Sequence, residues 1–253
     1  MAGILILPSS AFAFDDHLQI STQIGVQPST GPLNDDLTLA SPRLYGFFNI
    51  TDHFAIAADT GFGVISGFGE TEVHALNASL FGYYVDRTPR AKIRLGLGVA
   101  LPTNRPDRIP ISVISAARGL QDLWLYVPKT TTLIAPFRVE AQTGPVVLAV
   151  DGAAALAISE NEDLTVITQL AVEVSAPLGP FDVGTRLGVV AVPTESGEPD
   201  ADAAQISANP FVRVNMESVS VHAGLVFNLD RPFGWSFEDD RVLGIDAGVT
   251  VHW

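Results

Sequence analysis

The chain of 253 residues contains no cysteine and few basic side chains. The lack of cysteine excludes disulfide bonds, thiolate catalysis and cysteine-ligated zinc, and it is compatible with an oxidising compartment. Lys and Arg number 14 against 28 Asp and Glu, so the formal net charge is −14. Because nucleic-acid binding requires clustered basic residues that neutralise phosphates, this balance argues against a nucleic-acid partner.

Long apolar runs and nucleotide-binding motifs are missing as well. No segment approaches the roughly 18 to 20 apolar residues that a membrane-spanning helix requires. There is no P-loop and no dinucleotide fingerprint, and the glycine-rich stretch GFGVISGFGE at 61–70 leads into no predicted helix. We therefore expect no bound cofactor.

Patterns for catalysis or metal binding are equally sparse. The five histidines lie in different segments, and none has a serine and an acid at a recognisable spacing for a hydrolase. His222 and His252 are candidates for neighbours on adjacent strands, but two ligands do not make a metal site. We expect neither catalytic residues nor a metal ion.

The chain is nevertheless apolar on average, with a mean hydropathy of +0.29. This composition suits a protein whose acids lie in loops while its apolar residues face a non-aqueous phase. At the N-terminus, the apolar stretch Gly3 to Leu7 and the small-x-small pattern at Ala11 to Ala13 are typical of the end of a secretory signal peptide. We predict a signal-peptide remnant at 1–13 and one domain at 14–253, with an N-terminal strand as the alternative for the first segment.

Hydrophobicity alternates with a period of two through most of the chain. Near the N-terminus, Leu18, Ile20 and Ile24 share one face and the polar Gln19 and Gln23 share the other, which is the pattern of a β-strand. Twelve such strands are predicted, at about 17–27, 37–50, 53–64, 72–85, 91–101, 130–142, 145–157, 164–176, 180–192, 204–216, 218–229 and 242–253.

The connections between these strands alternate between short and long. The short ones are 50–52, 86–90, 142–145, 176–180 and 215–218, and the others are 28–36, 65–71, 102–129, 158–163, 193–203 and 230–241. Transmembrane β-barrels show this asymmetry, with tight periplasmic turns and longer extracellular loops. An even strand count places both termini on the periplasmic side.

Periodicity alone does not separate a barrel in lipid from a pair of soluble β-sandwiches, because the two differ only in which face is enclosed. Small residues and charges of both signs on the polar faces favour lipid, as do aromatic residues at predicted strand ends. Those near the short turns are Phe48, Phe54, Tyr83, Tyr84, Phe181 and Trp253, and those near the long loops are Phe62, Trp124, Phe227 and Trp235. We predict an all-β fold, a closed antiparallel transmembrane β-barrel of about twelve strands.

The last strand, GIDAGVTVHW at 244–253, alternates apolar residues and ends in an aromatic one. It resembles the sorting signal of Gram-negative outer-membrane β-barrel proteins, without pointing to a subfamily. The matching residues are Ile245, Ala247, Val249, Val251 and Trp253. The resemblance implies a place in the bacterial outer membrane, contact with its lipid and lipopolysaccharide, recognition by the barrel-assembly machinery, and a monomeric or small homo-oligomeric state.

Charged residues on the strands are predicted to face the lumen, because an ion in hydrocarbon costs several kcal/mol. The face pattern places these residues there: Arg43, Asp59, Lys92, Arg94, Arg138, Glu140, Asp151, Glu173, Asp182, Arg186, Arg213 and Asp246. Either they line an aqueous path and tune its ion selectivity, or they pair across a narrow lumen and seal it. Twelve strands lie between the filled eight-stranded and the open sixteen-stranded barrels, and we favour the narrow pore.

The longest connection, 102–129, carries Arg105, Arg108 and Arg118 in an otherwise acidic protein. Loops of this length are usually functional or disordered. One interpretation is a constriction loop folded into the barrel mouth, with a short amphipathic helix at 111–123. The other is a cap packed on the outer rim, or an extra hairpin, and we favour the cap because loops usually run over protein surfaces.

The acidic connections include SENED at 159–163 and PDADAA at 199–204. They lack the spaced ligands and the glycine of an EF-hand loop, so we expect solvated loops rather than divalent-cation sites. The function predicted from the sequence is a narrow passive channel for small solutes or ions. The alternatives are a sealed structural or adhesive barrel with a salt-bridged lumen and, third, an outer-membrane lipid-modifying enzyme.

Overall fold

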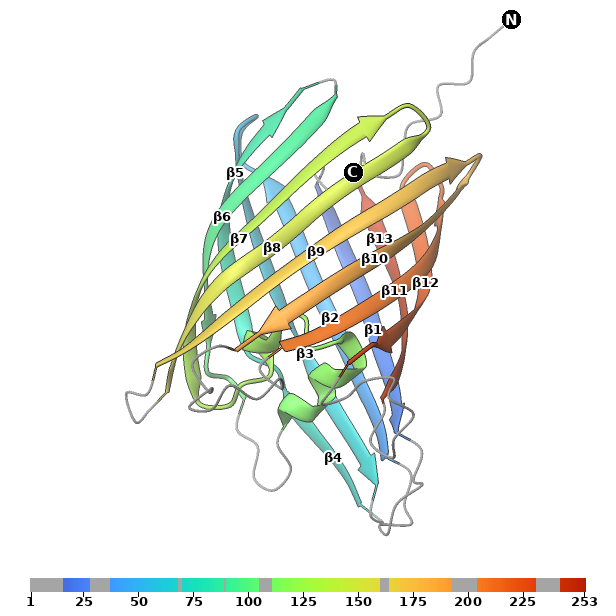
Figure 1. Ribbon diagram of the computed structural model, residues 1–253. Coiled ribbons are helices and arrows are strands. Elements are labelled where there is room, and N and C mark those ends of the chain that lie inside the picture. Colours follow the sequence, from blue (N-terminus) through green and yellow to red (C-terminus); the bar gives the residue numbers. More distant parts are fainter. Residues whose placement is uncertain are drawn as a thin grey trace, which may run out of the picture.

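The chain folds into a closed antiparallel β-barrel in the computed structural model, which describes residues 16–27, 37–67, 70–88, 90–104, 111–159, 164–192, 204–230 and 242–253 (Figure 1). The strands are β1 (His17–Gln27), β2 (Leu37–Asn49), β3 (Phe54–Gly67), β4 (Glu70–Ala75), β5 (Ala78–Arg87), β6 (Ala91–Leu101), β7 (Thr130–Thr143), β8 (Val146–Ser159), β9 (Leu164–Leu178), β10 (Phe181–Ala191), β11 (Ala204–Asn215), β12 (Val219–Asn228) and β13 (Leu243–His252). The predicted fold class is confirmed.

The barrel closes through β1, which pairs antiparallel with both β2 and β13. Around the rest of the ring each strand pairs with its neighbour in sequence, except at β3. Residues 62–67 of β3 pair with β4, and residues 54–59 of β3 pair with β5. The predicted strand at 72–85 is therefore split into β4 and β5 by Leu76 and Asn77, and the ring itself has the predicted twelve strands.

The first and last described residues, Asp16 and Trp253, lie on the side of the short turns, as an even strand count requires. The backbone N–H of Trp253 donates to the carbonyl of Asp16 at 3.3 Å. On the same side, Gly144 and Gly179 adopt φ of +60° and +69° in the tight turns after β7 and β9. Positive φ is disfavoured for residues with a Cβ, so glycine is the natural choice at both turns.

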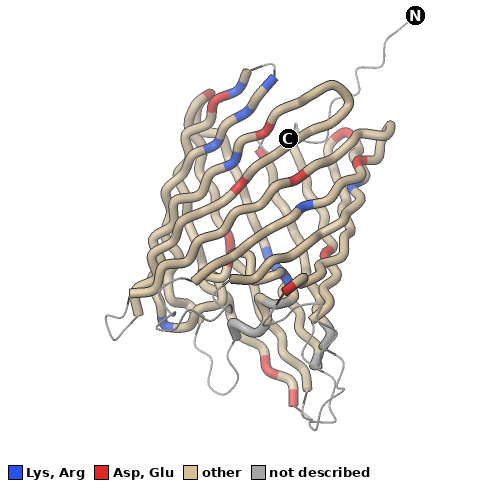
Figure 2. The backbone as a smooth tube through the Cα atoms, in the orientation of Figure 1, with Lys and Arg blue, Asp and Glu red and all other residues tan. Residues whose placement is uncertain are grey.

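Side chains alternate between the two faces of the wall. Leu170, Val172 and Val174 of β9 are each at least 40% exposed on the outer face, while Glu173 and Ser175 between and beyond them are buried on the inner face. The Lys, Arg, Asp and Glu positions are distributed over several strands of the barrel (Figure 2). The outer surface is therefore an apolar band of the kind that lipid solvates.

Two of the residues assigned to the aromatic girdles lie elsewhere. Tyr83 and Trp124 are buried inside the barrel, whereas Phe48, Phe54 and Trp253 are exposed on the outside. Tyr83 is adjacent to Tyr84 on β5, so the alternation of the strand turns one of the two rings inward. Trp124 belongs to a segment that enters the lumen. Trp235 lies outside the described residues.

Among the described residues, helical structure consists of two 3₁₀ segments, η2 (Ile111–Arg118) and η3 (Leu123–Leu125), where the sequence predicted an amphipathic helix over 111–123. Within the described ranges, no helix combines the length and the apolar character needed to cross a membrane. The predicted signal-peptide remnant at 1–13 lies outside the described residues.

Candidate functional site

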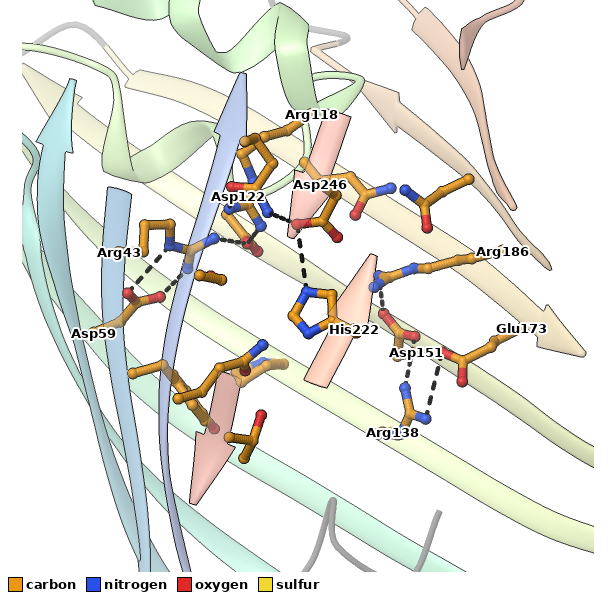
Figure 3. A pocket seen from close by; sticks show the side chains of 18 of the residues that line it. Arg43, Asp59, Arg118, Asp122, Arg138, Asp151, Glu173, Arg186, His222 and Asp246 are labelled. Atoms are coloured by element: carbon orange, nitrogen blue, oxygen red, sulfur yellow. Dashed lines mark hydrogen bonds and ion pairs between the residues drawn. The ribbon is translucent and has the colours of Figure 1, made fainter. Parts of the chain in front are cut away.

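A cavity of about 390 Å³ lies inside the barrel and is lined by every strand of the ring, with the 3₁₀ segments on its extracellular side (Figure 3). Its charged lining residues are Arg43, Asp59, Arg94, Arg118, Asp122, Arg138, Asp151, Glu173, Arg186, Arg213 and Asp246. Aromatic rings alternate with these charges: the guanidinium of Arg94 lies 4.9 Å from the ring centroid of Tyr83 and 5.4 Å from that of Phe47.

The structure places the strand charges named in the sequence analysis on the inner face. Nine of them line the cavity. Glu140 and Asp182 lie buried in the wall beside Arg138 and Arg213. Lys92 is the register partner of Glu140 on the neighbouring strand.

One group of ion pairs runs around the wall from β7 to β10. Arg138 contacts Asp151 at 3.2 Å, Glu140 at 3.3 Å and Glu173 at 3.6 Å. Arg186 contacts the other carboxylate oxygen of Asp151 at 2.5 Å. These pairs join residues of the same or nearby strands of one wall, so they compensate the buried charges without closing the centre of the lumen.

Residues 111–126, which we call the plug, fold into the extracellular end of the lumen. The η2 part of the plug packs against the inner faces of β1, β2, β3, β12 and β13. Ile114, Ala117, Leu125 and Tyr126 are fully buried there. The cap on the outer rim that we favoured from the sequence is therefore wrong for this part of the connection.

The physical reason for the inward fold is the change in the inner face toward the extracellular side. The inward positions of the strands turn apolar there, and they form one buried cluster with the plug; examples are Leu39, Ile65, Ile167 and Val190. Such side chains would be exposed to water in an open pore, and burying each one contributes roughly 1.5–3 kcal/mol.

Close approach of the plug also explains two small residues of the wall. A Cβ atom at Gly25 of β1 would lie 2.6 Å from the Cβ of Ala117, and Gly244 of β13 faces the backbone of the same residue. Glycine at these two positions lets η2 lie directly against the first and last strands.

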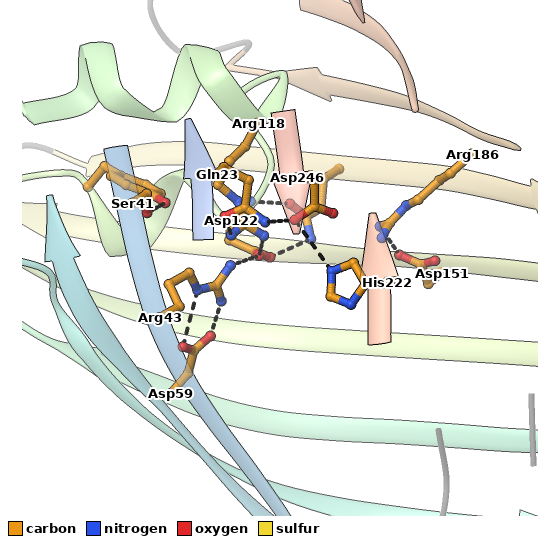
Figure 4. A network of polar contacts seen from close by, with 12 residues as sticks. Gln23, Ser41, Arg43, Asp59, Arg118, Asp122, Asp151, Arg186, His222 and Asp246 are labelled. Carbon is orange, nitrogen blue, oxygen red and sulfur yellow. Dashed lines mark hydrogen bonds and ion pairs between the residues drawn. The ribbon is translucent and has the colours of Figure 1, made fainter. Parts of the chain in front are cut away.

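Polar contacts at the tip of the plug centre on Asp122 (Figure 4). One of its carboxylate oxygens, Oδ2, accepts hydrogen bonds from Arg43 at 2.8 Å and from Arg118 at 3.0 Å. Its backbone N–H donates to Gln169 of β9 at 2.9 Å. Arg43 is also paired with Asp59 on β3.

The same network continues across the barrel seam. Arg118 donates to Gln23 of β1 at 2.7 Å, and Gln23 donates to Asp246 of β13 at 2.5 Å. His222 of β12 lies 3.5 Å from the same carboxylate. The plug is therefore connected through polar contacts to strands on both sides of the closure.

Burial alone would raise the pKa of the Asp122 carboxyl, but the guanidinium groups of Arg43 and Arg118 outweigh burial and hold this pKa well below its usual range. A carboxyl group with a lowered pKa in the folded state contributes stability above its unfolded pKa and loses it only as the pH falls toward the folded value. Asp122 therefore stays ionised at neutral and mildly acidic pH.

A break in the wall anchors the base of the plug. Asn77, between β4 and β5, is fully buried, and its side-chain amide donates to the carbonyls of Trp124 at 2.9 Å and Val127 at 2.7 Å. Its side-chain oxygen accepts from the backbone N–H of Asn104 at 3.1 Å. The interruption of the predicted strand thus has a structural role, because Asn77 binds the chain both before and after the segment that folds inward.

We expect Asn77→Ala to destabilise the seated plug by about 2–4 kcal/mol, because three buried or partly buried backbone groups lose their partner at once. Hydrogen exchange of the amides at 123–127 measures the effect, and the amides of β8 and β9 should keep their protection. Asn209→Ala, which removes an amide from the cavity lining, is the matched control. Unchanged exchange at 123–127 would contradict this anchoring role.

The remaining predicted residues of the long connection are only partly placed. Arg118 lies in the plug, while Arg105 and Arg108 lie outside the described residues, as do most of the acidic connections. The sequence analysis did not identify Asp122, Gln169 and Asn77, and it placed Gln23 on a polar strand face without assigning it to the site. An apolar shift at the inner positions of several strands was the available signal for a packing partner inside the barrel.

The C-terminal strand occupies the closing position of the barrel. Ile245, Val249, Val251 and Trp253 are exposed on the outer face, and the ring of Trp253 lies 5.7 Å from that of Phe48. Their proposed part in sorting is a property of biogenesis and stays a prediction. In the part of the chain that the structure describes, no group of three or more His, Asp or Glu residues is arranged to hold a metal ion.

No protein-family model and no curated protein matches the chain. Solved structures do. An outer-membrane channel from Pseudomonas putida F1 is 11% identical, with 98% of this chain and 100% of that chain covered and a TM-score of 0.66. The NanC porin is 8% identical over 93% and 100% of the two chains, with a TM-score of 0.57.

The KdgM porin, solved in complex with disordered oligogalacturonate, is 10% identical and covers 93% of this chain and 99% of its own, with a TM-score of 0.56. At sequence identities this low, the comparisons show a shared fold alone. The closed barrel, the exposed apolar outer face and this likeness together show that the chain has the fold of outer-membrane β-barrels.

Proposed function

We propose that the protein is a narrow passive channel for ions and small polar solutes, with the charged cavity as its aqueous vestibule and the plug as its constriction. The observation that carries the proposal is the cavity of about 390 Å³ lined by side chains of both signs. A barrel with a purely structural role has no need of such a space, since apolar packing would fill it at lower cost in desolvation.

The ion pairs between β7 and β10 support conduction over a sealed lumen. The contacts of Arg138 and Arg186 follow one wall, and the partly buried Arg186 faces the cavity. Rings and rows of charged side chains of this kind set ion selectivity in pores. The packing of the plug favours the second candidate, a sealed surface barrel, and planar-bilayer recordings of the refolded protein separate the two: steady single-channel currents support the channel, and their absence supports the sealed barrel.

We expect Arg186→Ala to lower the permeability ratio of chloride to potassium by about fivefold. A unit charge near the ion path is worth about 1 kcal/mol in a water-filled lumen, and about 1.4 kcal/mol corresponds to tenfold in a ratio. Reversal potentials in a salt gradient measure the change. Arg186→Lys keeps the charge and should retain most of the wild-type ratio, while an unchanged ratio in the alanine variant would show that ions do not pass this wall.

A lipid-modifying enzyme is the third candidate, and the placement of side chains argues against it. Ser220 and His252 form a serine–histidine contact at 3.2 Å, but both are buried inside the barrel at its periplasmic end. Acyl chains on the outer wall do not reach them. We further propose that the C-terminal strand is recognised by the barrel-assembly machinery and that the outer band contacts lipid and lipopolysaccharide.

A further inference from the structure

We infer that Arg43 and Arg118 form an anion site inside the lumen, that Asp122 occupies this site as a ligand supplied by the protein itself, and that a small monocarboxylate takes its place when the tip of the plug withdraws. The inference rests on the proposed channel and adds to it a ligand class and a means of opening.

The contacts of Asp122 are those of a bound carboxylate. Two guanidinium groups from different elements converge on one oxygen, at 2.8 and 3.0 Å. The amide nitrogen of Gln169 lies 3.4 Å from the other oxygen. Charge-assisted hydrogen bonds of this kind are the strongest that carboxylates make in proteins.

The site also has capacity that Asp122 leaves unused. The Nε atom of Arg118 is buried and makes no hydrogen bond within the part of the chain that the structure describes, although Nη1 and Nη2 of the same group do. A guanidinium binds a free carboxylate through two parallel N–H groups. A free carboxylate, unlike a side chain fixed to the plug, is able to orient both of its oxygens toward Arg118.

The backbone conformation around Asp122 favours withdrawal of the tip of the plug. Leu120 and Asp122 both adopt left-handed φ, at 60° and 56°, next to Gly119 at 65°. This conformation is disfavoured for residues with a Cβ, so the tip is held in place by its contacts rather than by its local preference. Arg118 precedes this turn and belongs to η2, whose apolar face is packed on the wall, so the arginines remain when the tip moves.

Neighbouring acids restrict the ligand to one negative charge. Asp59 pairs with Arg43, and Asp246 is linked to Arg118 through Gln23. A second negative charge on the solute would lie near these carboxylates without a further guanidinium to compensate it. A small monoanion of the acetate type reproduces the group that the site already holds.

Chemical rescue of Asp122→Ala tests the inference. In the refolded variant in detergent, acetate should raise the midpoint of thermal unfolding saturably and restore the wild-type emission of Trp124, which is two residues from the vacated position and buried. Acetamide at equal concentration and ionic strength should do neither. Wild type, whose site is filled, should require an at least tenfold higher acetate concentration for half of the effect.

Two further variants keep the test decisive. Asp122→Asn preserves shape and should respond weakly to acetate, because its neutral amide still fills the site. Asp122→Ala combined with Arg118→Met should respond more weakly, with a half-saturating acetate concentration at least tenfold higher than that of Asp122→Ala. Equal responses to acetate and acetamide, or equal acetate sensitivity of wild type and Asp122→Ala, would overturn the inference. Because no current is measured, this outcome is separate from a failure of the channel proposal, which is the absence of current.

Discussion

Replacement of plug residues 111–126 by a Gly-Ser linker of equal length is expected to increase single-channel conductance on the order of tenfold, since a lumen without an inserted segment is intermediate between filled and open barrels. The plug is a part of the described chain that enters the lumen, and its Ile114, Leu125 and Tyr126 are fully buried in the apolar cluster. The measurement is the current step in planar bilayers at fixed voltage and salt.

The same replacement should lower stability, and this cost is the control on its interpretation. Inner-face residues such as Leu39, Ile65 and Val190, now packed in the buried cluster with the plug, would face water. Exposing each apolar side chain costs roughly 1.5–3 kcal/mol. A variant that retains β-barrel circular dichroism, unfolds at a lower temperature and conducts more is the expected result. Unchanged conductance in a folded variant would mean that the ion path does not pass the plug.

Leu170→Arg is expected to destabilise the barrel by about 2–4 kcal/mol, because it places a cation on the lipid-facing wall near the bilayer midplane. Leu170 lies near the middle of β9 and is 45% exposed on the outer face. In a soluble protein, an arginine at such an exposed position would change stability by only about 0.5 kcal/mol. Equilibrium unfolding by urea in lipid vesicles gives the difference directly.

Depth along the same strand provides the matched control. Leu178 also faces outward but ends β9 at the periplasmic turn. The cost of a lipid-facing arginine falls to about 0–1 kcal/mol near the interface, so Leu178→Arg should be nearly neutral. Equal effects of the two substitutions would argue that the outer face does not meet a bilayer.

The wall of the barrel was predictable from the sequence because a strand has only two faces. Alternation located eleven of the twelve strands of the ring within a few residues, while the predicted strand at 72–85 proved to be β4 and β5. The high cost of a charge in hydrocarbon assigned residues such as Arg186 and Asp246 to the inside. The alternation between short and long connections distinguished the periplasmic end of the barrel from its extracellular end. Each of these inferences depends on local pattern and a general energetic rule.

The plug was not predictable in the same way. A connection that enters a lumen has no periodic relation to the strands that it contacts, and Asp122 meets Arg43 from 79 positions away in sequence. The three residues Leu120, Asp122 and Lys129 adopt positive φ although none is glycine, so propensity did not indicate the turns either. What the sequence did contain, and the face analysis did not use, is the apolar character of inner positions such as Ile65 and Ile167.

The most direct test of the central claim, that the apolar face meets lipid while the charged face is enclosed, is a nitroxide scan of residues 169–175 on β9. The absence of native cysteine makes single-cysteine labelling straightforward. In bilayers we predict high accessibility to oxygen and low accessibility to a polar nickel chelate at Leu170, Val172 and Val174, alternating with low oxygen accessibility at Ala171 and Glu173. High nickel-chelate accessibility at the even positions, or oxygen maxima at the odd ones, would contradict the account.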